Sequence, residues 1–288
     1  MTKMTEQKNT EPEKYISPDC QYAKLSKHSG KGVFKHLFEP EHIHAINTAI
    51  ACQRPLLLTG DPGVGKTQLA RAAAKALGRF FVRHTVDAKT ESRDLLWQFD
   101  AVARLADAQL AKSLGWNKEN LATKNYLRPG PLWWGFNWKQ AKDELKATPP
   151  VQHDEGSDPK NGAVILIDEI DKAEIDVPNG LLEALGDASF QPEGFPEPVR
   201  VGDIPPLIVI TTNRERSLPD AFIRRCILMR IKLEKEADKL KAQLVKRGKA
   251  HTGLPEEILK EAADQLIKDR KAAKDQKWRY RPGQAEYL

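Results

Sequence analysis

An α/β fold, with a parallel sheet between layers of helices, is predicted by three segments of this chain. The first is a short apolar strand, 55–59, that enters a glycine-rich turn and then an alanine-rich helix over 68–77. The second and third are continuous apolar runs, 163–167 and 207–211, which end in acidic and amide side chains. Runs of this kind are typical of strands buried on both faces, as parallel strands are. Strands over 81–86 and 227–231 bring the expected number in the sheet to five.

The turn after the first strand reads Gly-Asp-Pro-Gly-Val-Gly-Lys-Thr and matches the phosphate-loop pattern G-x-x-x-x-G-K-[ST]. Glycines let the backbone N–H groups surround an anion, and the next helix presents its positive end to the same phosphates. Lys66 is expected to reach the β- and γ-phosphates of ATP, and the Thr67 hydroxyl to ligate Mg²⁺. An ordinary glycine turn is the less favoured alternative. The residues assigned to nucleotide binding are Gly60, Asp61, Pro62, Gly63, Val64, Gly65, Lys66, Thr67 and Gln68.

Polar side chains at the ends of the later strands predict the hydrolytic machinery. Asp168 is expected to hold Mg²⁺ through its water shell, and Glu169 to act as general base on the attacking water. Asn213 follows the next strand and is expected to orient that water or touch the γ-phosphate. Arg224 and Arg225 end a short helix before the last strand. An arginine placed there suits a nucleotide held by a neighbouring subunit better than one held by its own.

Composition, charge and cysteines exclude several classes of protein. The 288 residues are 40% hydrophobic and 30% charged, as in globular proteins. No stretch reaches the roughly 18 apolar residues of a membrane span, and 1–14 is polar without a secretory signal, so a cytoplasmic location is expected. The three cysteines have no zinc-site or disulfide spacing. Most of the net charge of +6 lies in 232–288, where 15 Lys and Arg are interspersed with 10 Asp and Glu, as on a solvated helical face.

In this order, the elements resemble AAA+ ATPases of the MoxR-like branch over about residues 15–288. The resemblance also rests on 54–60, on Arg-Pro-Gly-Pro-Leu-Trp-Trp at 128–134, and on Asp-Glu-Ile-Asp-Lys-Ala at 168–173, where MoxR proteins usually have Asp-Glu-Ile-Asn-Arg-Ala. It implies a P-loop NTPase domain of three αβα layers with a five-stranded parallel sheet, followed by a small all-α lid. It further implies a homo-oligomeric ring, usually a hexamer, with ATP and Mg²⁺ between subunits. In that ring Asn213 would be sensor 1 and Arg225 the arginine finger.

The sequence departs from the family in the lid, and this leaves the function open. MoxR proteins carry Ser-Pro-Arg-Ala there, whereas this chain has Gln284 in place of the sensor 2 arginine, for which Arg281 or Arg279 would have to substitute. The leading hypothesis is an ATPase that remodels a partner protein. Segments 93–97 and 133–134 resemble MoxR-like proteins of bacterial conflict systems, which suggests a partner encoded nearby. The alternatives are a nucleotide-gated switch or scaffold with slow turnover and a nucleic-acid-handling ATPase.

The remaining segments divide the chain into a disordered 1–14, an AAA+ domain over 15–232 and a helical lid over 233–288, which is expected to be truncated because related lids continue further. The lead-in 15–29 has few apolar anchors, and the family places it against the adenine. Helical spacing predicts an amphipathic helix over 94–114. Trp133, Trp134, Phe136 and Trp138 either fill a core or grip a substrate. A hairpin is predicted over 190–206. The apolar stripe of the lid is Leu240, Leu244, Ile258, Ala262, Leu266 and Ile267.

Overall fold

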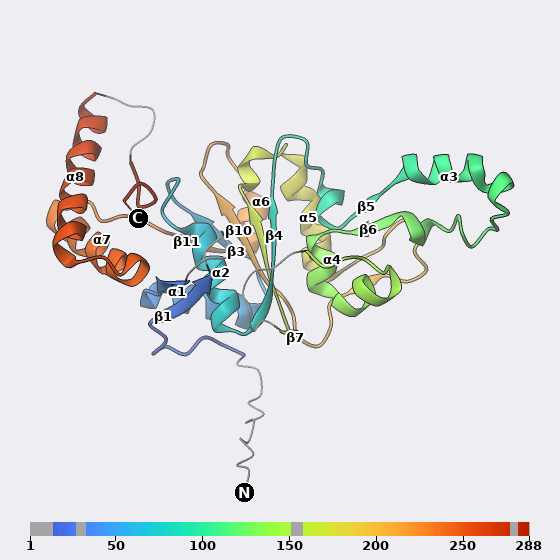
Figure 1. Cartoon of the computed structure of the whole chain (residues 1–288), viewed down its shortest axis with the longest axis horizontal. Helices are drawn as coiled ribbons and strands as arrows, with labels where there is room; N and C mark the ends of the chain where they lie inside the picture. Colours follow the sequence, from blue (N-terminus) through green and yellow to red (C-terminus); the bar gives the residue numbers. More distant parts are fainter. Residues whose placement is uncertain (1–13, 27–32, 151–157, 277–281, 288) are drawn as a thin grey trace, which may run out of the picture.

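The computed structural model describes residues 14–26, 33–150, 158–276 and 282–287, and a five-stranded sheet lies at its centre (Figure 1). Every neighbouring pair of strands in this sheet is parallel. In their order across the sheet, the strands are β11 (Ile227–Arg230), β3 (Leu56–Thr59), β10 (Leu207–Thr212), β7 (Asp158–Asp168) and β4 (Arg79–Thr85). The predicted α/β fold with a five-stranded parallel core is therefore confirmed.

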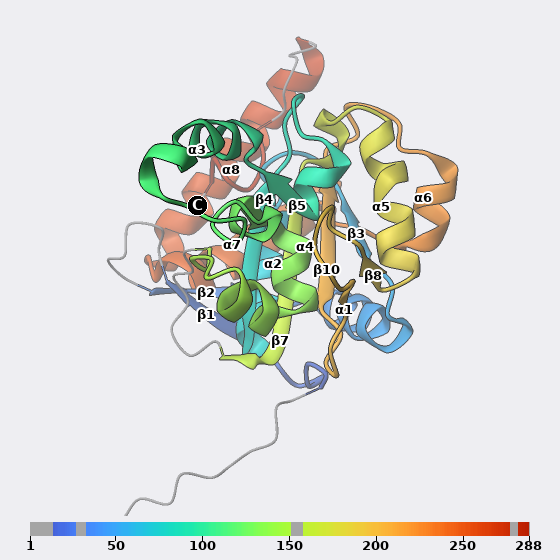
Figure 2. The same ribbon diagram turned by 90° about the vertical axis from the view of Figure 1, so that its right-hand side faces the viewer.

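Helices cover both faces of the sheet, because alternate strand residues point to opposite sides. Leu56 and Leu58 pack with helices α1 (Pro40–Cys52) and α2 (Lys66–Ala76) in one apolar cluster. Leu57 lies between them in the chain and belongs to a second cluster on the other face. The helices of that second cluster are α4 (Pro131–Phe136), α5 (Asp176–Gly186) and α6 (Asp220–Arg225). The three layers that result lie side by side in Figure 1, and in the turned view of Figure 2 α4 lies in front of the sheet.

The lead-in before α1 forms an antiparallel hairpin of β1 (Tyr22–Ser26) and β2 (Val33–Leu37). Its side chains Ile16, Leu25 and Phe34 are buried in the cluster that covers α1 and α2. The lead-in is therefore better anchored by apolar side chains than the sequence analysis expected. The disorder predicted for 1–14 falls almost entirely on residues 1–13, which lie outside the described residues.

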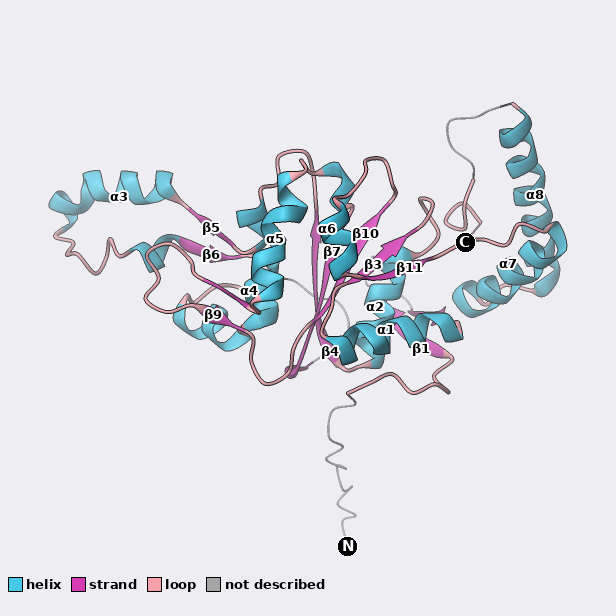
Figure 3. Cartoon of the chain, turned by 180° about the vertical axis from the view of Figure 1, so that it is seen from behind, coloured by secondary structure: helices cyan, strands magenta, loops and turns pink. Residues whose placement is uncertain are grey.

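An insert between β4 and β7 projects from one end of the molecule (Figures 1 and 3). The predicted helix over 94–114 is wrong in its first part, since α3 begins at Ala101. Before it, a 3₁₀ turn buries Leu95, and β5 (Trp97–Phe99) pairs with β6 (Leu127–Pro129), which draws the chain into an extended form. The apolar side chains of α3 are exposed, to 80% at Val102 and 63% at Leu105. The elements are η1 (Ser92–Leu95), β5, α3 (Ala101–Leu114), η2 (Thr123–Tyr126) and β6.

The aromatic segment is a core segment. Trp133, Trp134 and Phe136 are all buried on α4, against the sheet, so these side chains do not grip a substrate. The predicted hairpin is present as β8 (Ser189–Phe190) paired with β9 (Val199–Arg200). The short helical turns nearby are η3 (Gln140–Glu144) and η4 (Ile170–Lys172).

Helices α7 (Ala237–Thr252) and α8 (Glu256–Asp275) lie at the end of the molecule opposite α3 (Figure 3). They share a small apolar cluster of their own. On α8 its members are Leu259, Ala263 and Leu266, so the predicted stripe is shifted by one residue at Ile258, which is 50% exposed. Within the described ranges, no helix combines the length and apolarity needed to cross a membrane.

Candidate nucleotide site

The loop between β3 and α2 has the backbone of an anion cradle. Gly63 and Gly65 have φ angles of 74° and 98°, which residues with a side chain adopt only with strain. A Cβ atom at Gly60 would lie 2.5 Å from the carbonyl oxygen of Ile231, so glycine is required there as well. Helix α2 starts at Lys66, directly after this loop, and its N-terminus faces the same space. The turn thus fits the phosphates that the sequence motif predicts.

The Lys66 ammonium is held inside the loop by three oxygen atoms. Its Nζ donates to the carbonyl oxygens of Gly60 at 2.8 Å and Asp61 at 3.0 Å, and to Oδ1 of Asn213 at 2.6 Å. Lys66 is only 7% exposed, and burial lowers its pKa despite the acidic groups around it. The contact with Asn213 brings together two residues that are 147 positions apart in the chain, both assigned to the site from sequence.

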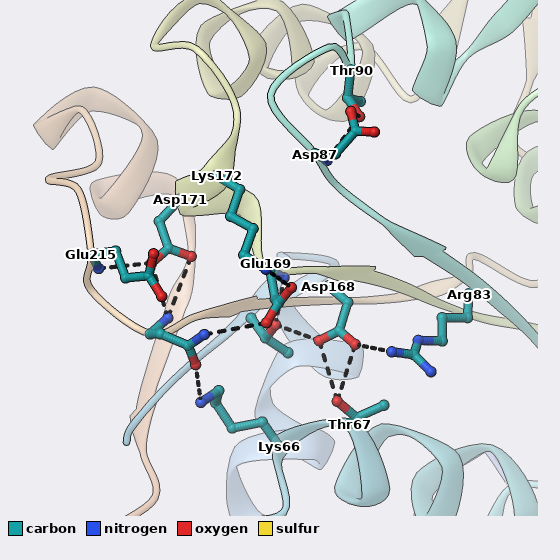
Figure 4. Close-up of polar contacts among 12 residues, drawn as sticks. Lys66, Thr67, Arg83, Asp87, Thr90, Asp168, Glu169, Asp171, Lys172 and Glu215 are labelled. Atoms are coloured by element: carbon teal, nitrogen blue, oxygen red, sulfur yellow. Dashed lines mark hydrogen bonds and ion pairs between the residues drawn. The ribbon is translucent and has the colours of Figure 1, made fainter. Parts of the chain in front are cut away.

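Asp168, at the end of β7, is buried beside the start of α2 (Figure 4). The Thr67 hydroxyl lies 3.1 Å from Oδ2 and 3.2 Å from Oδ1 of this carboxylate, and the Thr211 hydroxyl donates to Oδ1 at 2.7 Å. Hydroxyl and carboxylate oxygens are hard ligands, and Mg²⁺ in proteins takes one or two of them together with phosphate oxygens. The oxygen atoms of Thr67 and Asp168 therefore fit Mg²⁺.

Glu169 has a strained backbone and an engaged carboxylate. Its φ of 63° and ψ of 47° are left-handed, a conformation that costs a non-glycine residue about 1–2 kcal/mol. Its backbone N–H donates to the Thr211 hydroxyl at 2.9 Å, which helps to hold that conformation. The side chain accepts from Lys172 Nζ at 2.6 Å and from Asn213 Nδ2 at 3.4 Å. The hydrogen bond to Glu169 raises the pKa of Lys172.

Asp171 fixes the loop that carries Asn213. Its carboxylate is 2% exposed, and Oδ2 accepts the backbone N–H groups of Asn213 at 3.1 Å and Glu215 at 2.8 Å (Figure 4). The chain has aspartate here where MoxR proteins usually have asparagine. A buried carboxylate that accepts two backbone N–H groups holds a loop more firmly than a neutral amide does.

A cavity of about 470 Å³ opens in front of these groups. Gly60 and Asp61 do not line it, since their carbonyl groups serve Lys66 instead. The predicted site residues that line it are Pro62, Gly63, Val64, Gly65, Lys66, Thr67, Gln68, Asp168, Glu169 and Asn213. The structure thus brings most of the predicted nucleotide site together around one cavity.

The cavity is also lined by residues to which the sequence motifs assign no role. They include His36 and Leu37 of β2, His42 of α1, and Arg247 and His251 of α7. The guanidinium of Arg247 is 8% exposed and pairs with the Glu39 carboxylate at 2.7 Å.

Two of these histidines are uncharged at neutral pH. Burial lowers the pKa of His36 to about 3 and that of His42 to about 4. The Arg247 guanidinium also donates to the amide oxygen of Gln284, the residue at the expected sensor 2 position, which lines the cavity too. Arg281 and Arg279, the proposed substitutes, lie outside the described residues.

Arg225 does not line this cavity. It is exposed at the end of α6, as is Arg224, and both border a separate depression together with Arg54. The Arg54 guanidinium donates to the backbone carbonyls of Arg224, Arg225 and Cys226, and so fastens the end of the helix. A role for Arg225 in its own cavity is not supported by this placement.

The chain is similar to parts of several known proteins. The chain is 28% identical over 223 residues to the Lon protease of Aster yellows witches'-broom phytoplasma, covering 70% of this chain and 22% of that protein. It is 29% identical over 202 residues to Midasin of Giardia intestinalis, and this match covers 67% of this chain and 3% of that protein. The chain therefore spans less than a quarter of either relative. The crystal structure of a proposed ATPase from Cytophaga hutchinsonii is 14% identical, with a TM-score of 0.41, and the match covers 79% of this chain and 57% of that one.

One family model matches residues 55–226, more than half of the chain. That model describes the AAA domain of the dynein-related subfamily. The matched segment contains the phosphate loop, Asp168, Glu169, Asn213 and Arg225. This chain belongs to the AAA domain family, dynein-related subfamily.

Proposed function

We propose that this protein binds ATP with Mg²⁺ and hydrolyses it. The observation that carries the proposal is the convergence of Thr67, Asp168 and Glu169 on the cavity in front of the phosphate loop. The loop N–H groups and Lys66 would hold the phosphate chain, while Thr67 and Asp168 would hold the metal ion. Bound Mg²⁺ would neutralise charge on the phosphate oxygens.

Glu169 is the proposed general base. Its carboxylate already contacts the Asn213 amide, so the two side chains can share the task of orienting a water molecule. The carboxylate must then exchange its contact with Lys172 for that water before it can accept a proton. Asn213 also touches Lys66, which links the orientation of the water to the occupant of the phosphate loop.

Two variants test this function. Lys66→Ala removes the cation of the loop and is expected to abolish ATP binding in a calorimetric titration. Glu169→Gln keeps Thr67 and Asp168 and is expected to bind ATP but not to turn it over. Unchanged ATP affinity in Lys66→Ala would overturn the assignment of the loop. Hydrolysis at the parental rate in Glu169→Gln would show that another group is the base.

We further propose that the protein works as a MoxR-type ring, with Arg225 completing the site of an adjacent subunit. Arg225 is exposed and lies outside its own cavity, which supports action in trans. Mixing inactive Arg225→Ala with inactive Glu169→Gln should restore part of the turnover, because some interfaces then pair an intact Arg225 with an intact Glu169. An arginine finger contributes about 10³–10⁵ in rate, so few repaired interfaces are needed. A mixture that co-assembles but stays inactive would refute this role.

The work done by turnover is proposed to be the remodelling or activation of a partner protein. A nucleotide-gated switch with slow turnover is the second candidate, and the engagement of Glu169 by Lys172 at 2.6 Å favours it. In α7 and α8, lysines pair with acidic residues, such as Lys241 with Asp264 at 2.6 Å, which weakens the case for nucleic acid. A steady-state rate that rises with a purified partner protein would support the first candidate. A slow rate unaffected by any partner would support the second.

A further inference from the structure

Arg83 is a second cation in the corner of the cavity where Asp168 lies. It stands near the end of β4, the strand beside β7 at the edge of the sheet. Side chains alternate along a strand, so Arg83 shares a face with Phe81, which packs in the cluster around α2. That face leads to the start of α2. The guanidinium lies beside Asp168 (Figure 4), and its Nη2 donates to Oδ2 at 2.7 Å.

The Arg83 side chain has room to make other contacts. It is 41% exposed, whereas the Asp168 side chain is 6% exposed, and it lines the cavity with Lys66 and Thr67. A guanidinium has five N–H donors in a planar fork, and Asp168 is the acceptor that the described part of the chain offers it. The other donors are therefore available to a ligand that enters the cavity.

Asp168 can release Arg83 without becoming an isolated buried charge. Its Oδ1 accepts the Thr211 hydroxyl, and the Thr67 hydroxyl lies within 3.2 Å of both oxygens. The oxygen that Arg83 occupies, Oδ2, is also one that faces Thr67, the other proposed metal ligand. A divalent cation bound to this carboxylate oxygen would therefore compete with the guanidinium for it.

We propose that Arg83 recognises the terminal phosphate of ATP from within the same subunit. When ATP fills the cavity, the guanidinium leaves Asp168 and donates to the γ-phosphate oxygens, for which its fork is suited. ADP has no γ-phosphate, so with ADP the guanidinium stays on Asp168. Arg83 would thereby distinguish the two nucleotides and, during hydrolysis, stabilise charge on the transferred group. This inference rests on the proposed function, and it concerns a residue other than Arg225.

The test is calorimetric binding of ATP and of ADP, each with Mg²⁺ and with a chelator. Arg83→Ala is expected to weaken ATP binding about 10- to 100-fold, the range for a lost charge-assisted hydrogen bond, in both conditions. With the chelator, the ADP affinity of Arg83→Ala is expected to stay within about twofold of the parental value, because no metal ion is then bound to Asp168. Arg83→Lys keeps a charge beside Asp168 but loses the fork, so an intermediate ATP affinity is expected. Arg93→Ala removes an exposed guanidinium that does not line the cavity, and should change neither affinity.

The outcomes separate three cases. Equal weakening of ATP and ADP, or weakening confined to the Mg²⁺ condition, would overturn the inference, because Arg83 would then act only by holding Asp168. A parental preference for ATP over ADP that survives in Arg83→Ala would overturn it as well, with the proposed function intact. A parental protein that binds neither nucleotide would overturn the proposed function and this inference together. Thermal unfolding without nucleotide checks that the variants fold. If Arg83→Ala does not fold, the ATP and ADP affinities of Arg83→Lys decide the test.

Discussion

Replacing Arg54 by alanine is expected to loosen the end of α6 without touching the nucleotide cavity. Arg54 Nε donates to the carbonyl oxygen of Arg225 at 2.9 Å, and Nη2 donates to those of Arg224 and Cys226, the latter at 3.2 Å. The last carbonyl groups of a helix have no partner inside the helix. One side chain, from the segment before β3, thus supplies donors to three carbonyl groups around the proposed arginine finger.

The magnitude follows from the exposure of these contacts. A hydrogen bond from a charged group contributes about 1.5–3 kcal/mol, but these bonds are exposed or half-buried, and water replaces much of what is lost. We therefore expect Arg54→Ala to lower the free energy of unfolding by about 1–2 kcal/mol. In a domain of this size, that corresponds to a Tm lower by about 2–8 °C.

Turnover should respond more strongly than stability. A reacting group misplaced by about 1 Å costs on the order of 100-fold, so we expect the ATPase rate to fall about 10- to 100-fold. ATP affinity should stay within about twofold, because Arg54 does not line the nucleotide cavity. Arg54→Lys places one compact ammonium group where the guanidinium donated to three carbonyl groups. Its ATPase rate should therefore lie between those of Arg54→Ala and the parental protein.

The assay is steady-state hydrolysis over a range of protein concentrations, with ATP binding and thermal unfolding measured on the same samples. Arg93→Ala is the matched control, since it also removes an arginine, but one that lines neither cavity. A parental rate in Arg54→Ala, with the Tm lowered as expected, would refute the link between the Arg54 contacts and Arg225. A loss of ATP binding would show that Arg54 acts through the phosphate loop instead.

Three further predictions concern groups around the cavity. Burial lowers the pKa of His42 from 6.5 to about 4, so between these pH values the unfolded chain binds a proton that the folded chain does not. The urea concentration needed for unfolding should therefore fall as the pH falls from 6.5 to 4, and it should fall less in His42→Gln. Lys172→Met removes an exposed ion pair worth up to about 1 kcal/mol, and by releasing Glu169 it should raise the hydrolysis rate up to about fivefold. A slower rate would mean that Lys172 orients the Glu169 carboxylate. Asp171→Ala leaves two half-buried N–H groups without their carboxylate, and it should lower the free energy of unfolding by about 1–2 kcal/mol and slow hydrolysis. An unchanged rate would show that Asn213 needs no such support.

The core of the fold could be predicted because its signals are local. Each of the five strands of the sheet contains a short apolar run, and the glycine-rich turn fixes where β3 ends and α2 begins. The order of the strands across the sheet is not contained in any of these runs. The order depends on pairing between strands that are far apart in the sequence, such as β4 and β7.

The insert shows where local spacing misleads. Leu95 and Val102 both fit a helical stripe, yet Leu95 is fully buried in a 3₁₀ turn and Val102 is 80% exposed on α3. The difference comes from the pairing of Trp97 with Pro129, which are 32 positions apart. A window of 11–18 residues cannot contain that partner, so the spacing predicts one continuous helix where the chain first turns and then extends.

The candidate site likewise contains residues that local sequence predicts and residues that depend on distant strand pairing. The phosphate loop is one continuous segment, and Asp168 ends its strand with Glu169 directly after it, so the sequence predicts both places. Arg83 reaches Asp168 only because β4 pairs with β7, with Val82 opposite Ile165 and Thr85 opposite Asp168. One signal was nevertheless present in the sequence. An arginine directly after the apolar residues 80–82, on the same face as Phe81, would have to meet a carboxylate or solvent near the end of the sheet where ligands bind. Side-chain alternation along strands beside a phosphate loop is therefore the feature to examine when the motifs themselves have been assigned.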